Sequence, residues 1–354
     1  RAADAFGWGV VFSDDTLAHF AEADAESHRA IVERFVYWTD IDVLVRGERL
    51  RTTGHGFCGI ARTTLLEALQ SRAETLGVRL LFQREIAGIA DVGDADLVLA
   101  ADGVNSRIRD QAAARFQPAI EWGRCRFSWL GTTLPLEAFT FIFKEGEDGL
   151  FQVHAYPFQH GLSTFIVECR EEVWRNAGLD GADEKETVQY LEALFREELH
   201  GHRLLPNNSV WRAFPTITNA TWTDGNVVLA GDAAHTAHFS IGSGTKLAME
   251  DAVALTEVFR RRGVKDIPGA LEAYESERRP VVARLQAAAR TSQDWFENSA
   301  RHLRLDPVRF AFSLLTRSRR VTYGSLGQRD PELVERVTAS FGASSGAGNP
   351  GGPL

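Results

Sequence analysis

Two short apolar segments, far apart in the sequence, end in the same kind of turn. Residues 96–103 read Asp-Leu-Val-Leu-Ala-Ala-Asp-Gly, and residues 226–232 read Asn-Val-Val-Leu-Ala-Gly-Asp. Each pattern predicts a buried strand followed by a turn that faces a ligand, since glycine lets the backbone approach closely. We expect both strands in one sheet, because parallel strands present their carboxyl ends at the same edge. This expectation restricts the chain to an α/β architecture.

The second of these turns carries the stronger chemical signal. It leads into a loop that contains Gly242 and Gly244, and then into a helix that runs through Asp251. Backbone amides at glycines and at a helix N-terminus stabilise negative charge. Asp232, at the end of the strand, can accept hydrogen bonds from sugar-type hydroxyls. The alternative interpretation is an ordinary strand–turn–helix connection.

The first turn is followed by Ser106 and Arg109. The Arg109 guanidinium could reach a phosphate group, and Asp102 could organise the turn. The alternative interpretation is a helix-capping aspartate beside a surface arginine.

The sequence between the two turns changes character. From residue 124 to residue 168, aromatic and β-branched segments are separated by Gly or Pro, which is typical of antiparallel strands in a second domain. We therefore expect an α/β domain over 1–120, a β-rich domain over 121–212, and the rest of the α/β domain with C-terminal helices over 213–335. The remainder, 336–354, is rich in small residues towards its end and is expected to be a flexible tail.

Two local patterns complete the expected secondary structure. Leucines at helical spacing predict a helix over 58–76 that ends at Gly77, and the next residues, 78–82, resemble a short buried strand.

Composition excludes several classes of protein. The chain has 48 acidic and 39 basic residues, a formal charge of −9, which disfavours a general nucleic-acid binder. Its three cysteines are too few and too scattered for a disulfide framework or a zinc site, which fits a cytoplasmic protein. His235 and His238 lack the further ligands that a metal site needs. No apolar run is long enough for a membrane span.

The motifs resemble those of a known family. The Asp-Gly and Gly-Asp turns, with Arg62 at the start of a helix, resemble the FAD-dependent aromatic monooxygenases of the para-hydroxybenzoate hydroxylase type. Four further segments resemble the branch of that family that acts on aryl-CoA thioesters: 6–14 (Phe-Gly-Trp-Gly-Val-Val-Phe-Ser-Asp), 54–60 (Gly-His-Gly-Phe-Cys-Gly-Ile), 163–168 (Ser-Thr-Phe-Ile-Val-Glu) and 238–244 (His-Phe-Ser-Ile-Gly-Ser-Gly).

The resemblance implies a fold and a reaction. The fold is a Rossmann-like FAD-binding domain with an inserted β-rich substrate domain and C-terminal helices. In that family NADPH or NADH reduces FAD, and dioxygen then forms a flavin hydroperoxide that attacks an electron-rich aromatic ring. For this chain the expected substrate is a small aromatic compound, with an aryl-CoA thioester favoured.

The resemblance also implies roles for residues. The expected FAD-binding residues are Arg62, Asp102, Gly103, Arg109, Gly231, Asp232, Gly242, Ser243, Gly244 and Thr245. The expected substrate wall consists of Trp129, His154, Tyr156 and Phe239, and His238 is the candidate catalytic residue. His154 and Tyr156 alternate onto one face of a strand. The alternative for each of these side chains is a core aromatic or a structural histidine.

One departure from the family pattern has a consequence for function. The family begins with a βαβ unit that carries GxGxxG, whereas the match at residues 54–59 follows a charged stretch and is interpreted as chance. Without that unit, the chain would expose strand edges and bind FAD weakly. Two alternatives therefore stay open: a truncated, non-catalytic fragment, and a flavin oxidoreductase, such as a dehydrogenase or halogenase, that acts on a different aromatic compound.

Overall fold

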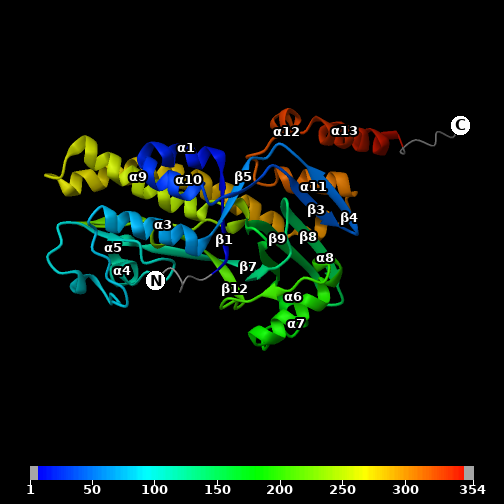
Figure 1. The fold of residues 1–354 in the computed structure, drawn as a ribbon, viewed down its shortest axis with the longest axis horizontal. Coiled ribbons are helices and arrows are strands. Elements are labelled where there is room, and N and C mark those ends of the chain that lie inside the picture. The colour runs from blue at the N-terminus through cyan, green and yellow to red at the C-terminus, as the bar shows by residue number, and fades with distance from the viewer. Residues whose placement is uncertain (1–6, 347–354) are drawn as a thin grey trace, which may run out of the picture.

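The computed structural model describes residues 7–346, which form two lobes joined by one long helix (Figure 1). Helix α10 (Ile267–Glu297) contributes Leu271 and Tyr274 to the core of one lobe and Phe296 to the core of the other. Its first residues lie beside α9 (Gly244–Arg262), and its last residues pack against the large sheet. Because a single helix contributes to both cores, the two lobes are held in fixed relation.

The first lobe contains the sheet that the two apolar segments predicted. Strands β6 (Val98–Ala100) and β14 (Val227–Leu229) pair in parallel, with Val228 opposite Leu99, and β13 (Thr223–Asp224) pairs with the other side of β14. Val228 is fully buried against the helices α9 and α10. The expectation that these distant segments share one sheet is confirmed.

A second small sheet lies next to α1 (Asp14–Ala23), α2 (Ala25–Val32) and α3 (Arg62–Thr75). It has the order β1 (Gly9–Ser13), β5 (Phe57–Ala61), β2 (Val36–Trp38). The prediction of a helix over 58–76 was therefore wrong in its first turn. Cys58 and Ile60 alternate into the core as strand residues, and the helix begins only at Arg62.

The GxGxxG match at 54–59 runs into β5 and not into a helix. Gly59 lies where β5 crosses β9, and a Cβ atom there would approach the Pro157 carbonyl oxygen to 2.4 Å. The glycine is thus needed for close packing of two strands, in agreement with a chance match.

The second lobe is built on an eight-stranded sheet. Its strands are β3 (Ile41–Val45), β4 (Glu48–Thr52), β7 (Pro118–Thr132), β8 (Phe139–Gly146), β9 (Gly149–Gln159), β10 (Leu162–Arg170), β11 (Leu204–Leu205) and β12 (Arg212–Asn219). The expected antiparallel strands over 124–168 are present as β7 to β10. The β3–β4 hairpin joins this sheet through a parallel pairing of β3 with β8, although residues 41–52 were expected in the α/β domain. Val43 and Phe141 pack in the same core, which explains why the hairpin belongs here.

Helices cover the two faces of this sheet. One face carries α6 (Glu171–Asn176), α7 (Glu184–Leu194) and α8 (Arg196–Leu199), and the other carries the end of α10 with α11 (Pro307–Thr316), α12 (Tyr323–Arg329) and α13 (Pro331–Gly346). The flexible tail expected over 336–354 is wrong for residues 336–346, which continue α13, while residues 347–354 lie outside the described part. Leu333 and Val337, one helical turn apart, are buried against Phe310 and hold this helix.

The segment 78–82 is not a strand. Val78, Leu81 and Phe82 are 52%, 50% and 44% exposed, so the apolar composition of this segment does not reflect burial among residues 7–346. Within the same range, no helix is both long and apolar enough to cross a lipid bilayer.

Candidate functional site

The carboxyl ends of β6 and β14 lie side by side. The Ala230 backbone N–H donates a hydrogen bond to the Ala100 carbonyl oxygen at 3.0 Å, so the two turns leave the sheet together. Gly103 has a φ of +83° and Gly231 a φ of +58°, conformations that favour glycine in both turns. The structure therefore brings the two motifs to one edge, as the sequence suggested.

Asp102 organises its own turn. Its carboxylate accepts hydrogen bonds from the Ser106 hydroxyl at 2.5 Å and from the backbone N–H of Arg107 at 2.8 Å. These contacts stabilise the start of helix α4 (Arg107–Gln111), so the capping interpretation describes this residue.

Arg109 differs from its predicted role. Its guanidinium is buried, with the residue only 1% exposed, and donates to the carbonyl oxygens of Val104 at 3.0 Å and Ala233 at 3.4 Å. A phosphate ligand needs donors that face outward, whereas these donors connect the two turns to each other. These contacts assign Arg109 to positioning the two turns, and neither of its two expected places, at a phosphate or on the surface, is seen in this arrangement.

A buried ionic network fixes the turn after β14, which begins with the 3-10 helix η3 (Gly231–Ala233). The Asp251 carboxylate accepts from the Gly231 backbone N–H at 2.9 Å, from His235 Nε2 at 2.8 Å and from Arg278 Nε at 2.7 Å. Burial alone raises the pKa of Asp251, but His235 and Arg278 outweigh it and lower the pKa. Neither Asp251 nor Arg278 could be assigned a role from the sequence, because a charged side chain on a helix is usually solvated.

Asp232 lies in η3, at the start of this turn, and points outward. Its side chain is exposed, and no group among residues 7–346 hydrogen bonds its carboxylate. Nevertheless, enough protein surrounds it that desolvation raises its pKa, against the opposing charge of nearby Arg62. An exposed carboxylate that is still surrounded by protein is typical of a concave surface.

The N-terminus of α9 lies beside Asp232. Gly242 has a φ of +62° and ends the 3-10 helix η4 (Phe239–Ile241), and Ser243 precedes α9 without capping it through its side chain. The first backbone N–H groups of α9, at Gly244 and Thr245, are therefore not satisfied by a capping side chain and suit an anionic or carbonyl group.

A groove is lined by two of the predicted cofactor residues. It has a volume of about 480 Å³, lies between α1, α3 and α9, and includes both Arg62 and Thr245 in a largely apolar lining. The Arg62 Nε atom is buried and has no hydrogen-bond partner in the described part of the chain. Arg62, Asp232 and the start of α9 thus converge, although they come from three separate segments.

The predicted substrate wall is a cluster of rings on one face of the large sheet. Trp129 and His154 contact Phe239, with ring centroids 6.0 Å and 5.2 Å away, and Tyr156 lies on the same face as His154. The Tyr156 hydroxyl donates to the Gly9 carbonyl oxygen at 3.0 Å, and burial raises the pKa of Tyr156 to about 12. The residues expected to form one wall are thus brought together.

A carboxylate behind this wall, Glu168, was assigned no role from the sequence, although it ends the segment 163–168. Glu168, on β10, is 1% exposed; His154 Nε2 lies 3.0 Å from its Oε2, and His238 Nε2 lies 3.5 Å from its Oε1. Burial alone raises the pKa of Glu168, but the hydrogen bonds from the two histidines outweigh it and hold the pKa at about 2. A glutamate within an apolar strand was the one available signal.

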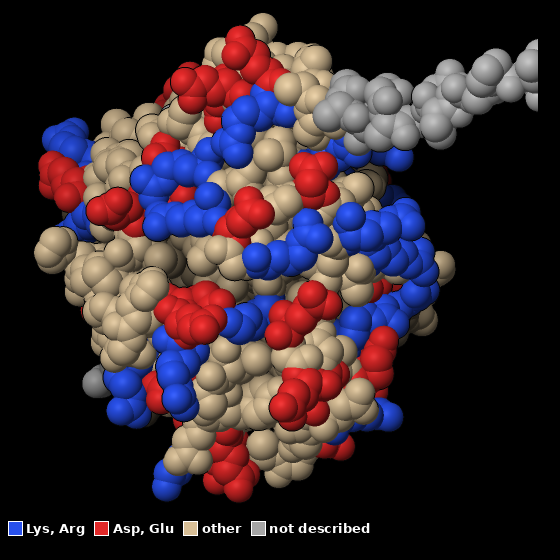
Figure 2. Space-filling view, turned by 90° about the vertical axis from the view of Figure 1, so that its right-hand side faces the viewer, with Lys and Arg blue, Asp and Glu red and all other residues tan. Residues whose placement is uncertain are grey.

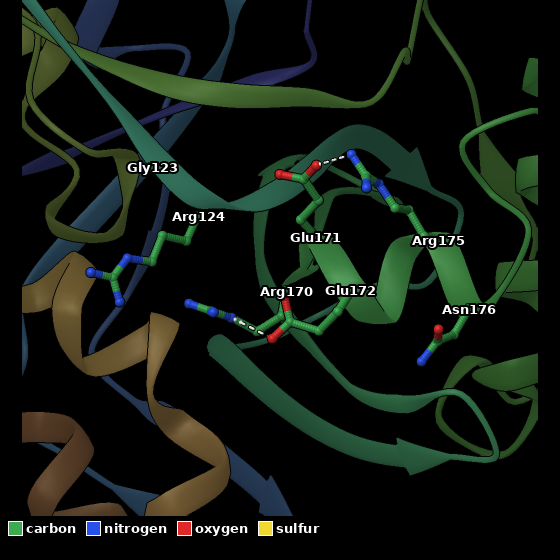
Figure 3. A pocket seen from close by; sticks show the side chains of 7 residues that line it. All are labelled: Gly123, Arg124, Arg170, Glu171, Glu172, Arg175 and Asn176. Carbon is green, nitrogen blue, oxygen red and sulfur yellow. Dashed lines mark hydrogen bonds and ion pairs between the residues drawn. The ribbon is translucent and has the colours of Figure 1, made fainter.

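A second hollow, of about 500 Å³, lies beyond the end of this sheet (Figure 3). Its lining consists of Gly123, Arg124, Arg170, Glu171, Glu172, Arg175 and Asn176. Arg170 pairs with Glu172 at 3.0 Å and Arg175 pairs with Glu171, so most of the positive charge is compensated. On the face of the molecule shown in Figure 2, acidic and basic side chains are likewise interspersed.

Comparison with known families identifies the kind of domain that contains this site, the edge at which the β6 and β14 turns, Arg62 and the start of α9 converge (the convergent edge). Residues 17–289, which include both strand-end turns and the start of α9, match the family described as the FAD binding domain. The chain belongs to this family. FAD is therefore the cofactor that the FAD binding domain of this chain is built to hold.

Individual relatives of this FAD binding domain carry more specific names. The chain is 46% identical over 347 residues to salicyloyl-CoA 5-hydroxylase of Streptomyces sp, covering 95% of this chain and 66% of that protein. It is 37% identical over 293 residues to 3-hydroxy-4-methyl-anthranilyl-[aryl-carrier protein] 5-monooxygenase of Streptosporangium sibiricum, covering 83% and 78%. The chain thus spans just under two thirds of the first relative.

The fold agrees with a solved structure. The tetrameric form of 2-methyl-3-hydroxypyridine-5-carboxylic acid oxygenase superposes with a TM-score of 0.67 at 21% identity, covering 92% of this chain and 88% of that chain. This similarity supports the architecture, a Rossmann-like FAD domain with a β-rich second part.

Proposed function

We propose that the protein is an FAD-dependent monooxygenase that uses NADH or NADPH and dioxygen to hydroxylate an aromatic ring carried as an aryl thioester. The observation that carries this proposal is the meeting of the β6 and β14 turns, Arg62 and the α9 N-terminus at one edge, with a wall of aromatic rings beside it.

The residues at this edge fit FAD. Asp232 offers an unpartnered carboxylate for ribityl hydroxyl groups, Arg62 has an unpartnered Nε, and the first amides of α9 are uncapped. We assign Asp232 to the ribityl chain, the amides of Gly242 to Thr245 to the pyrimidine edge of the ring, and Arg62 to the flavin or its phosphates. Bound there, FAD supplies the exchange of electrons with the nicotinamide and dioxygen.

The chain itself contributes a site that holds an aromatic ring and excludes water. Trp129 and Phe239 are half-buried and supply flat apolar surface, which favours stacking or edge contact with a substrate ring, while Tyr156 is buried and stacks on Phe139. Water is excluded by the same rings, and this exclusion strengthens every polar contact made at the site.

Two relatives favour a thioester substrate. One is named for salicyloyl-CoA and another for an anthranilyl group on an aryl-carrier protein, so both act on aryl groups joined to a larger carrier. We therefore assign the aryl group to the aromatic wall and the carrier to a position outside it.

The test is the oxidation of NADH and of NADPH by the FAD-loaded full-length protein, with mass analysis of products. The panel pairs aryl-CoA thioesters, salicyloyl-CoA among them, with the corresponding free acids. We expect stimulation and a product one oxygen atom heavier with thioesters. Stimulation by free acids alone would contradict the thioester, and no stimulation by any aromatic compound would contradict the monooxygenase.

A further inference from the structure

Two buried N–H donors converge beside Gly7. The Arg62 Nε and Trp129 Nε1 atoms are buried, and neither has a hydrogen-bond partner among residues 7–346. A Cβ atom at Gly7 would lie 3.9 Å from the first nitrogen and 3.8 Å from the second, and the atoms nearest to that position belong to these two residues. Both donors therefore border the same small space, into which the glycine projects no side chain.

Backbone contacts hold both donor residues in place. The Arg62 backbone N–H donates to the Trp8 carbonyl oxygen at 2.8 Å, which ties the start of α3 to the residue after Gly7. The Ser209 hydroxyl donates to the Trp129 carbonyl oxygen at 2.6 Å. Gly7 itself has a φ of +83°, a conformation that favours glycine. The two donors are thus positioned by the fold before any ligand binds, which lowers the cost of binding.

The donor pair lies at the junction of the cofactor groove and the aromatic wall. Arg62 lines the groove of about 480 Å³. Burial raises the pKa of both Asp232 and Tyr156, and the positive charge of Arg62 opposes this rise in each, so its guanidinium is close to both sites. Trp129 belongs to the wall, where its ring centroid lies 6.0 Å from that of Phe239. A polar group attached to a ring in the wall is therefore near these donors.

We propose that Nε–H of Arg62 and Nε1–H of Trp129 together bind the acyl oxygen of an aryl thioester, which is the carbonyl oxygen one carbon away from the substrate ring. This inference rests on the proposed function and deepens it, because it makes the acyl group a determinant of the substrate class. The chemistry of the groups matches. Arginine and indole N–H groups only donate, whereas a carbonyl oxygen only accepts and has two lone pairs for two donors.

The arginine can serve the substrate and the cofactor together. A guanidinium carries five N–H groups in a fixed fork, so the Nη groups of Arg62 remain for the flavin while Nε lies beside Trp129. A hydrogen bond from a charged donor is stronger than one between neutral groups, and exclusion of water strengthens it further. A ligand without the acyl oxygen leaves both donors buried and unpaired, which disfavours its binding.

The first experiment compares benzoyl-CoA with S-benzyl-CoA, in which a methylene group replaces the carbonyl group. Each is titrated by calorimetry into the FAD-loaded full-length protein without nicotinamide, so that no turnover occurs. We expect benzoyl-CoA to bind at least about tenfold more tightly, because only its oxygen pairs with the two donors. Equal affinities in the wild type would overturn the proposal, and this result needs no variant.

A variant isolates the contribution of the indole donor. Trp129→Phe keeps a flat ring but removes the N–H group, so the preference for benzoyl-CoA should fall at least about threefold. Trp211→Phe is the matched control. The Trp211 Nε1 atom is also buried and unpartnered among residues 7–346, but its ring packs in the core on the opposite face of the large sheet. An equal preference in Trp129→Phe and Trp211→Phe would overturn the proposal.

A spectroscopic measurement detects the hydrogen bond directly. In nitrogen–proton NMR spectra of the indole groups, one signal of the FAD-loaded wild type should move downfield with benzoyl-CoA and stay in place with S-benzyl-CoA. This signal should be absent from Trp129→Phe. If the Trp129 signal instead moves to the same position when FAD alone is added to the apoprotein, the donor belongs to the cofactor and the proposal is wrong.

The two proposals fail in different ways. If the wild type hydroxylates aryl thioesters but binds benzoyl-CoA and S-benzyl-CoA equally, the acyl-oxygen site is wrong and the function stands. If the wild type prefers benzoyl-CoA as expected but no aromatic compound stimulates the oxidation of NADH or NADPH, the acyl-oxygen site stands and the monooxygenase is wrong.

Discussion

Two aspartates near one turn show how far single residues can be interpreted. Asp232 and Asp251 both lie close to Gly231, yet the first points outward with a raised pKa and the second is buried with a lowered pKa. The sequence identified Asp232 through its position at a strand end. It did not identify Asp251, whose partner Arg278 is distant in the sequence and visible only in the folded chain.

Replacing Asp251 with Asn should strongly destabilise the protein. The change removes one of the two carboxylates that pair with Arg278, which is 6% exposed, and leaves only Glu250; breaking such a buried pair costs about 3–5 kcal/mol. Urea unfolding at neutral pH measures the free energy of unfolding of the wild type and the variant. The matched change Asp232→Asn should leave the free protein as stable or slightly more so, because a raised carboxylate pKa means that ionisation disfavours the folded state. Equal losses in both variants would contradict the assignment of the network.

The low pKa of Glu168 predicts that the free energy of unfolding depends on pH in the acid range. Its pKa is about 2 in the folded protein against an ordinary 4.5, so its contribution is present above 4.5 and is lost as the pH falls from 4.5 towards 2. The difference in unfolding free energy between wild type and Glu168→Gln should be constant at about 1–3 kcal/mol above pH 5 and shrink below pH 4.5. Urea titrations at a series of pH values test this, over the range where both remain folded. A difference that does not change with pH would exclude an ionised Glu168.

At the level of elements, the spacing of apolar residues predicted strands and helices correctly where those apolar residues are buried. The parallel pair β6–β14 and the strands β7 to β10 appear as expected. The start of α3 was placed four residues early because Cys58 and Ile60 are apolar at spacings that suit a strand as well as a helix. The start of the expected tail continues α13 because Val337 is buried there, whereas small residues dominate only the end of the tail.

Gly59 offers a test of how β5 packs against β9. An added methyl group would lie 2.4 Å from the Pro157 carbonyl oxygen and 3.1 Å from the Trp38 ring, so Gly59→Ala should destabilise by about 1–3 kcal/mol or more. Gly181→Ala, where no atom lies within 4 Å of the added Cβ, is the matched control. Thermal unfolding should separate the two; a Gly59→Ala protein as stable as the control would show that β5 and β9 are less closely packed than described.

For the molecule as a whole, the sequence predicted which segments meet but not what holds them. The two turns were expected at one edge, and they are. Arg109 holds the two turns together, and α10 contributes to both cores. Both features depend on contacts between residues more than 100 positions apart, which no local pattern encodes. The family likeness identified the cofactor, while the buried group around Glu168 became visible only through its geometry.

FAD should stabilise the folded protein if the convergent edge holds it. A ligand present at a hundred times its dissociation constant adds about 2.7 kcal/mol to the free energy of unfolding. Unfolding curves with and without FAD measure this gain. A gain that is unchanged in Asp232→Asn would place the cofactor elsewhere.

The most direct test of the account is the affinity for FAD itself, measured by equilibrium titration of the full-length protein. We predict that Asp232→Asn weakens binding at least about tenfold, or about 1.4 kcal/mol, while Asp94→Asn, at an exposed position ahead of β6, leaves it unchanged. If the Asp232→Asn protein binds FAD as tightly as the wild type, the two turns do not form the cofactor site and the account is wrong.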